Sequence, residues 1–182
     1  MVCAALALAG CGSDFGPFNL TANLQSNRLM LEGHDAVAYF TQGTNVKGSA
    51  EHTVVHQGVT YWFASADNAA AFKKEPAKYA PQFGGYCTNG IAYGIPWGGD
   101  ADTFKIIDGK LYIFGGKESR NYFSMDEKRN LERAHQLWRE EVAGSHALPQ
   151  RYKRLIFRVP HYKTGAQLAE EWKAHQAKSG GK

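Results

Sequence analysis

Hydrophobic and polar residues alternate in two short segments of the chain. The first is QGVTYWF at residues 57–63, and the second is DGKLYIF at residues 108–114. In each, a Gln-Gly or Asp-Gly pair can adopt the positive φ angles of a tight turn, and β-branched residues precede the pair. A period of two places the Tyr and the Phe of each segment on one side of a strand. The pattern predicts two β-hairpins.

The two segments are 51 positions apart, which suggests a duplicated unit. The same offset carries Phe72 onto Phe123, so each hairpin is expected to lead into a short helix that packs an aromatic ring on the strands. Coincidence is the alternative, because only four positions match.

Helical spacing is clearest after the second hairpin. Ser124 and Glu127 have the spacing of a capping box. Apolar residues then recur at intervals of three, four and four, at Leu131, Ala134, Trp138 and Val142. This spacing predicts an amphipathic helix whose apolar face packs on the rest of the domain.

Three less regular segments complete the secondary structure. The apolar run at residues 37–40 predicts a short buried strand, and residues 151–159 predict an edge strand. Thr164 and Gln167 are placed to cap a last short helix. Together the segments predict an α+β fold, with a small antiparallel sheet built from hairpins and flanked by helices.

The amino-terminal sequence divides the chain into regions. An apolar run ends in Leu-Ala-Gly-Cys at Cys11, which is typical of a bacterial lipoprotein signal peptide over residues 1–11. We expect a flexible tether at 12–28, the folded domain at 29–144 and a basic extension at 145–182. No Lys or Arg precedes the apolar run, so an accidental resemblance to a lipobox is the alternative.

This interpretation also sets the cysteine chemistry. Cys3 leaves with the signal peptide and Cys11 carries lipid, so Cys87 stays as the single thiol and no internal disulfide forms. The expected location is the cell envelope, facing the periplasm. No Asp follows Cys11, and by resemblance to enterobacterial lipoproteins this favours the outer membrane.

Composition and charge set further limits. The 182 residues, 43% of them hydrophobic, suffice for one core. The net charge of +4 arises in residues 145–182, which hold eight Lys or Arg and two Glu. These cations either contact anionic lipid or an acidic partner, or form a solvated face. The chain contains no nucleic-acid-binding motif, so we expect no nucleic-acid partner.

Five motifs in order resemble the YHS domain family, in its longer envelope type, over residues 29–142. They are GHDAVAYF, YWFAS, Phe72, EPAKYAPQFGGYC and DGKLYIF. The resemblance implies a compact α+β domain with a small antiparallel sheet and flanking helices. Short family members on metal-handling proteins carry cysteines and are taken to bind metal, whereas the envelope type mostly lacks an established activity.

The chain departs from the metal-binding members of that family. It has no cysteine near the start of the domain or near Ala64 and Asn68, where those members carry them. A tetrahedral zinc site rich in cysteine is therefore excluded by composition. His34 and Ala36 also replace the tyrosine and proline of the usual family motif.

A different metal site is the first candidate for chemistry. His34, Asp35 and Cys87 offer an imidazole, a carboxylate and a thiolate, which suit a transition metal such as copper, zinc or iron. The alternatives are that Asp35 forms a turn through its own backbone and that Cys87 is a buried, inert thiol. His52 and His56 lie four residues apart on a predicted strand, about 13 Å, and cannot hold one ion.

Aromatic residues are the second candidate. Tyr86, Tyr93 and Trp97 lie in a glycine-rich segment where a ligand can approach the backbone closely, so they are predicted to bind a small molecule. Packing in the core is the alternative. The remaining histidines, His135, His146, His161 and His175, are expected to be exposed and to bind nothing.

The sequence therefore favours a non-enzymatic, lipid-anchored envelope protein that binds a small ligand or a transition metal. No catalytic triad, carboxylate pair or nucleotide motif is present. One alternative is an adaptor that binds another envelope protein. A second alternative is an enzyme that uses the Cys87 thiol.

Overall fold

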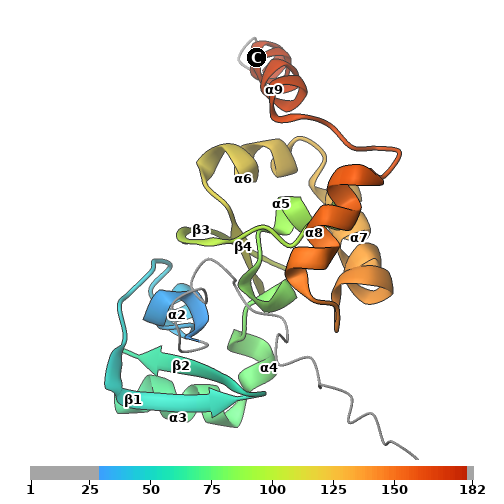
Figure 1. Ribbon diagram of the computed structural model, residues 1–182. Helices are drawn as coiled ribbons and strands as arrows, with labels where there is room; N and C mark the ends of the chain where they lie inside the picture. The colour runs from blue at the N-terminus through green and yellow to red at the C-terminus, as the bar shows by residue number, and fades with distance from the viewer. Residues whose placement is uncertain (1–28, 180–182) are drawn as a thin grey trace, which may run out of the picture.

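The computed structural model describes residues 29–179. The predicted signal peptide, the lipidation site Cys11 and the predicted tether lie outside the described residues. The described part combines helices with two antiparallel two-stranded sheets, which confirms the α+β class. Figure 1 shows the first sheet at the bottom of the view and the second above it.

Both predicted hairpins are present. The first pairs β1 (Ser49–His56) with β2 (Val59–Phe63), and the second pairs β3 (Asp100–Ile107) with β4 (Lys110–Phe114). Both residues of each turn have positive φ, at 50° and 73° in Gln57-Gly58 and at 48° and 70° in Asp108-Gly109. These angles belong to a type I′ turn, whose twist matches that of the strands.

The two hairpins share one register. Each of the five residue pairs in the first sheet has a counterpart 51 positions later in the second sheet. At the open end of the hairpins, Ser49 pairs with Phe63 in the first sheet, and Asp100 pairs with Phe114 in the second. An irregularity interrupts both ladders at the same place, between Ser49 and Thr53 and between Asp100 and Phe104. The repeat that the offset of 51 predicted is therefore present in the structure of the two hairpins.

The duplication extends beyond the strands. Helix α3 (Ala66–Lys74) follows the first hairpin and α6 (Lys117–Ser124) follows the second. A short 3-10 turn precedes each hairpin: η1 (Met30–Gly33) comes before the first and η2 (Gln82–Gly85) before the second. Leu31 and Phe83 hold nearly the same positive φ in these turns, 52° and 54°. Phe72 and Phe123 are both fully buried, as the sequence predicted.

The apolar run at 37–40 forms a helix and not the predicted strand. Helix α2 spans Ala38–Thr41. The carboxylate of Asp35 accepts hydrogen bonds from the backbone N–H groups of Val37 and Ala38, at 2.8 and 3.2 Å. Such bonds satisfy the free donors of a first helical turn and so favour helix over strand.

Two hydrophobic clusters form the core. The first lies around the β1–β2 hairpin and includes Met30, Tyr39 and Phe63, but also Leu111 and Ile113 from the second hairpin. The second lies among β4, α5 (Thr88–Ile91), α6 and α7 (Glu127–Leu137). The short helix α4 (Pro76–Tyr79) connects the two halves. Strand β4 contributes to both clusters, so the halves share one core.

The predicted amphipathic helix is present as α7, continued by the π-helical turn η3 (Trp138–Val142). Its start differs from the prediction. Asp126 precedes the first turn, no side chain caps it, and the hydroxyl of Ser124 donates to Arg120 O in α6 instead. The capping box was therefore wrong, because Ser124 belongs to the end of the preceding helix.

The carboxyl-terminal region forms two helices, α8 (Ala147–Ile156) and α9 (Gly165–Ser179). The edge strand predicted at 151–159 was wrong, since most of that segment continues α8. The cap of α9 is as predicted: Gln167 N donates to Thr164 Oγ1, and Thr164 N donates to Gln167 Oε1. Within residues 29–179, every helix is too short or too polar to cross a bilayer.

Candidate binding groove

A groove of about 950 Å³ opens between the β3–β4 hairpin and α7. The hairpin contributes Lys110 and Tyr112, and α7 with η3 contributes Glu132, His135 and Arg139. This volume is in the range of small-molecule sites.

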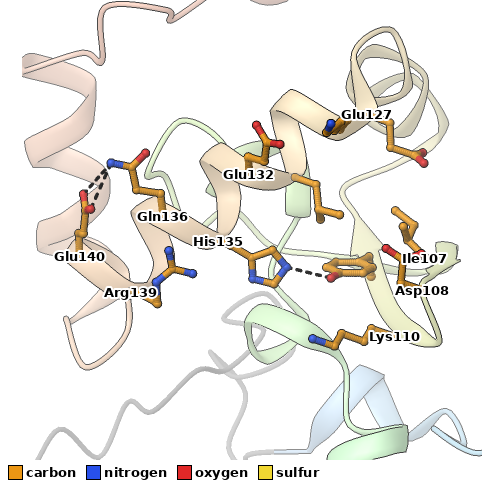
Figure 2. A pocket seen from close by; sticks show the side chains of 12 residues that line it. Ile107, Asp108, Lys110, Glu127, Glu132, His135, Gln136, Arg139 and Glu140 are labelled. Atoms are coloured by element: carbon orange, nitrogen blue, oxygen red, sulfur yellow. Dashed lines mark hydrogen bonds between the residues drawn. The ribbon is translucent and has the colours of Figure 1, made fainter.

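A hydrogen bond joins the two walls of the groove. The hydroxyl of Tyr112 lies 2.9 Å from Nε2 of His135, and Figure 2 draws this contact as a dashed line. Both rings also contact Phe83, whose centroid is 5.7 Å from Tyr112 and 4.9 Å from His135. The pair is thus held on a buried aromatic base.

Burial and neighbouring charges fix the protonation of this pair. Burial raises the pKa of Tyr112 to about 12, with a smaller contribution from Asp108. Burial lowers the pKa of His135 below its usual value, and the positive charges of Lys110 and Arg139 lower it further. Near pH 7 the phenol is protonated and the imidazole neutral, and the tautomer of the imidazole decides which of the two donates the hydrogen bond.

Charges of both signs surround the pair. In Figure 2, Lys110 lies below His135 and Glu132 above it. Arg139 is close enough to His135 to lower its pKa. On the other side, Glu127 forms an ion pair with Lys105. The lining also includes Asp108, Lys128 and Glu140, so charges of both signs are interspersed around a neutral imidazole.

His135 was expected to be exposed, whereas the structure places it half-buried in the wall of the groove. It lies four residues after Leu131 and three before Trp138, so it shares the apolar face of α7 that packs on the domain. This spacing was the available signal. The position of Lys110 opposite that face depends on how the hairpin and helix pack, which spacing does not reveal.

Asp35 is a structural carboxylate. Its side chain is fully buried, and one oxygen accepts the N–H groups of Val37 and Ala38. The other accepts from Ala64 N at 2.8 Å and from Asn68 Nδ2 at 2.6 Å. Both oxygens are occupied by donors from α2 and from the start of α3, in agreement with the alternative that Asp35 shapes its own backbone.

Cys87 occupies the equivalent place in the second half. It follows η2 as Asp35 follows η1, and Ser119 in α6 corresponds to Asn68 in α3. Cys87 Sγ lies 3.1 Å from Ser119 Oγ, so this pair repeats the link between Asp35 and Asn68. The thiol is free and buried, as the inert alternative predicted.

The structure does not assemble the predicted metal site. His34 Nδ1 lies 2.8 Å from the backbone oxygen of Leu31, Asp35 is saturated, and Cys87 belongs to the other half. Within the described part of the chain, no three His, Cys, Asp or Glu side chains form a group suited to a metal ion. Asp35 and Cys87 occupy equivalent positions in the two repeated units, after η1 and after η2. They therefore do not come together in one site.

The three predicted ligand-binding aromatics do not converge either. Tyr86 is buried with its ring tilted at 54° to that of Trp138, and Tyr93 packs against His161 and Tyr162. Trp97 is 41% exposed and lies under the guanidinium of Arg151. For Tyr86 and Tyr93, the alternative of packing holds, because the carboxyl-terminal segment and α7 cover the glycine-rich loop.

Comparison with protein families found a match to the YHS domain. The model of the YHS domain matches residues 37–83, which run from the start of α2 to η2. Comparison with curated proteins and with solved structures returned no match. The match covers a narrower stretch than the sequence motifs, and it ends before the second hairpin and the groove. The chain thus carries a YHS domain in its first half, as its motifs predicted.

Proposed function

We propose that this protein is a non-enzymatic, lipid-anchored protein of the bacterial envelope that binds a small zwitterionic ligand. The ligand occupies the groove between the β3–β4 hairpin and α7. A free amino acid or a short peptide has the required chemistry, because each carries one cationic and one anionic end.

The arrangement of charge around His135 is the observation that carries this proposal. Lys110 and Arg139 suit an anionic group, and Glu132 suits a cationic one. The neutral imidazole and the phenol between them offer a hydrogen-bonding floor without a net charge. A ligand with both charges pairs its anionic group with Lys110 or Arg139 and its cationic group with Glu132.

A transition metal at His34, Asp35 and Cys87 has less support. Four hydrogen-bond donors already occupy the oxygens of Asp35, and a metal would have to displace them. The thiol-dependent enzyme also has less support, because a catalytic thiol must reach its substrate and Cys87 is 4% exposed.

The envelope location rests on the sequence. The Leu-Ala-Gly-Cys motif at residues 8–11 supports lipidation at Cys11 and a protein that faces the periplasm, with the outer membrane favoured. Palmitate incorporation that is lost in C11S is the test of this part. Incorporation that persists in C11S would contradict it.

Binding is tested by NMR on the uniformly ¹⁵N-labelled protein, with the free amino acids and a set of dipeptides as probes. At least one probe is expected to shift the backbone signals around Lys110, His135 and Arg139. K110Q should weaken its binding about tenfold, because one charge-assisted hydrogen bond is removed. The same variant should raise the pKa of His135 toward its usual value.

K74Q is the matched control, since Lys74 is exposed at the end of α3 in the other half. It should leave probe binding and the pKa of His135 unchanged. If no probe shifts the groove signals at millimolar concentration, the proposal fails. Stoichiometric metal in protein purified without an affinity tag would instead support metal binding as the function.

A further inference from the structure

Apart from the buried Ala147, helix α8 turns its apolar side chains to solvent and packs on the protein through polar ones. Its inner face is held by Gln150, which is 5% exposed and donates to Gly94 O at 3.0 Å. Arg151 donates to Pro96 O at 2.9 Å, and Arg154 forms an ion pair with Glu141. A helix that packs on a domain normally buries its apolar face, so this arrangement is inverted.

The outer face carries large apolar side chains. Tyr152 is 65% exposed, Ile156 71% and Phe157 69%, and Leu148 and Leu155 are 52% and 38% exposed. Leu148, Tyr152, Leu155 and Ile156 recur with helical spacing and form one stripe about 100° wide. Phe157 continues the stripe where the helix ends. Over ten residues the stripe is about 13 Å long.

Cations border this stripe. Lys153 lies on one flank of the stripe at 100° per residue, and Arg158 follows Phe157. From Ala147 to Arg158 the chain has four cations and no acidic residue, and Glu141 of η3 pairs with Lys153 and Arg154. The surface is thus apolar in the middle and positive at its edges.

This charge pattern favours one of the two possible binding partners of the stripe, which are a second copy of the chain and a lipid bilayer. A second copy of the chain meeting the first through α8 would bring two cationic helices together, which is unfavourable. An anionic lipid bilayer complements both features, because acyl chains accept the apolar side chains and phosphate groups accept the cations. Tyr152 has the amphipathic character that favours the boundary between lipid and water.

We propose that α8 lies flat in the headgroup layer of an anionic bilayer, with Leu148, Tyr152, Ile156 and Phe157 inserted. This contact is independent of the ligand groove and of any lipid on Cys11. Helix α8 packs against η3, and Figure 1 draws it in front of α7. Bound in this way, the helix would fix the orientation of the domain on the membrane.

The test is flotation of the full chain carrying C11S with vesicles, so that no acyl anchor contributes. The vesicles are phosphatidylglycerol with phosphatidylethanolamine, and pure phosphatidylcholine for comparison. The protein should bind the anionic vesicles at least about tenfold more strongly than the neutral ones. I156D combined with F157D should weaken binding to the anionic vesicles by about tenfold or more.

V55D, also with C11S, is the matched control, because Val55 is 67% exposed on β1 in the other half. It should bind as the C11S chain does. Thermal unfolding of both variants should match that chain, since the altered side chains are exposed. Absence of vesicle binding, or binding unaffected by I156D with F157D, would overturn the proposal. So would a concentration-dependent dimer that this double variant abolishes.

Discussion

At the scale of single residues, hydrogen-bond partners determine what a side chain does. Asp35 and His135 both belong to residue types common in metal sites and active sites. Asp35 is saturated by four donors and supports the backbone, whereas His135 makes one hydrogen bond at the wall of an open groove. Residue type alone favoured Asp35 as a binding residue, whereas the hydrogen-bond partners favour His135.

Replacing Asp35 is expected to destabilise the protein. D35A leaves donors at the start of α2 and α3 without an acceptor inside the protein, and we expect the free energy of unfolding to fall by about 3 kcal/mol or more. Urea denaturation followed by circular dichroism measures this change. The control E51A removes an exposed carboxylate from β1 and should change stability by less than about 0.5 kcal/mol. Equal stability of D35A and E51A would contradict the structural role of Asp35.

At the scale of elements, local chemistry predicted the hairpins and failed elsewhere. Gln57-Gly58 and Asp108-Gly109 both form the expected turns, because turn residues set their own backbone angles. The segments 37–40 and 151–159 were predicted as strands. The first forms a helix because the nearby Asp35 carboxylate accepts the N–H groups of its first turn, and most of the second continues α8, which long-range contacts hold. Asp35 also binds α3, and Gln150 and Arg151 of α8 bind a loop more than 50 residues away.

The turn of the second hairpin can be tested by substitution. Gly109 has a φ of +70°, and a Cβ placed there would meet no atom within 4 Å, so G109A costs backbone strain alone. We expect it to lower the free energy of unfolding by about 1–2 kcal/mol, measured by urea denaturation.

G165A is the control for this substitution. Gly165 begins α9 with equally open surroundings and without a positive φ. Alanine there should leave stability unchanged or raise it slightly, because it restricts the unfolded chain. A loss of stability in G165A equal to that in G109A would show that backbone angle is not the cause.

At the scale of the whole molecule, the two halves complete one another. The core around the first hairpin includes Ala101, Leu111 and Ile113 from the second. The hydroxyl of Tyr39 donates to Ala101 O at 2.8 Å, and its ring packs edge-on against Phe104 at 4.7 Å. The matched YHS stretch of residues 37–83 therefore holds only part of its own core.

A fragment of residues 29–83 is accordingly expected not to fold alone. Loss of Leu111 and Ile113 removes about 3–6 kcal/mol of hydrophobic stabilisation, which is comparable with the whole stability of a small domain. Thermal unfolding by circular dichroism should show no cooperative transition for this fragment. The control fragment 29–160 retains both core clusters and should unfold cooperatively. A cooperative transition in the shorter fragment would mean that the first half is an independent domain.

The sequence by itself determined what depends on neighbours in the chain: the two hairpins, their shared offset, the amphipathic helix α7 and the family of the first half. Turn residues and periodic apolar positions act over a few residues, so they can be recognised without a fold. Only the tertiary structure decided that Asp35 is saturated and that Asp35 and Cys87 lie in separate units. It alone placed His135 opposite Lys110 and turned the apolar face of α8 outward. These features depend on contacts between segments far apart in the chain, and such contacts leave no local pattern.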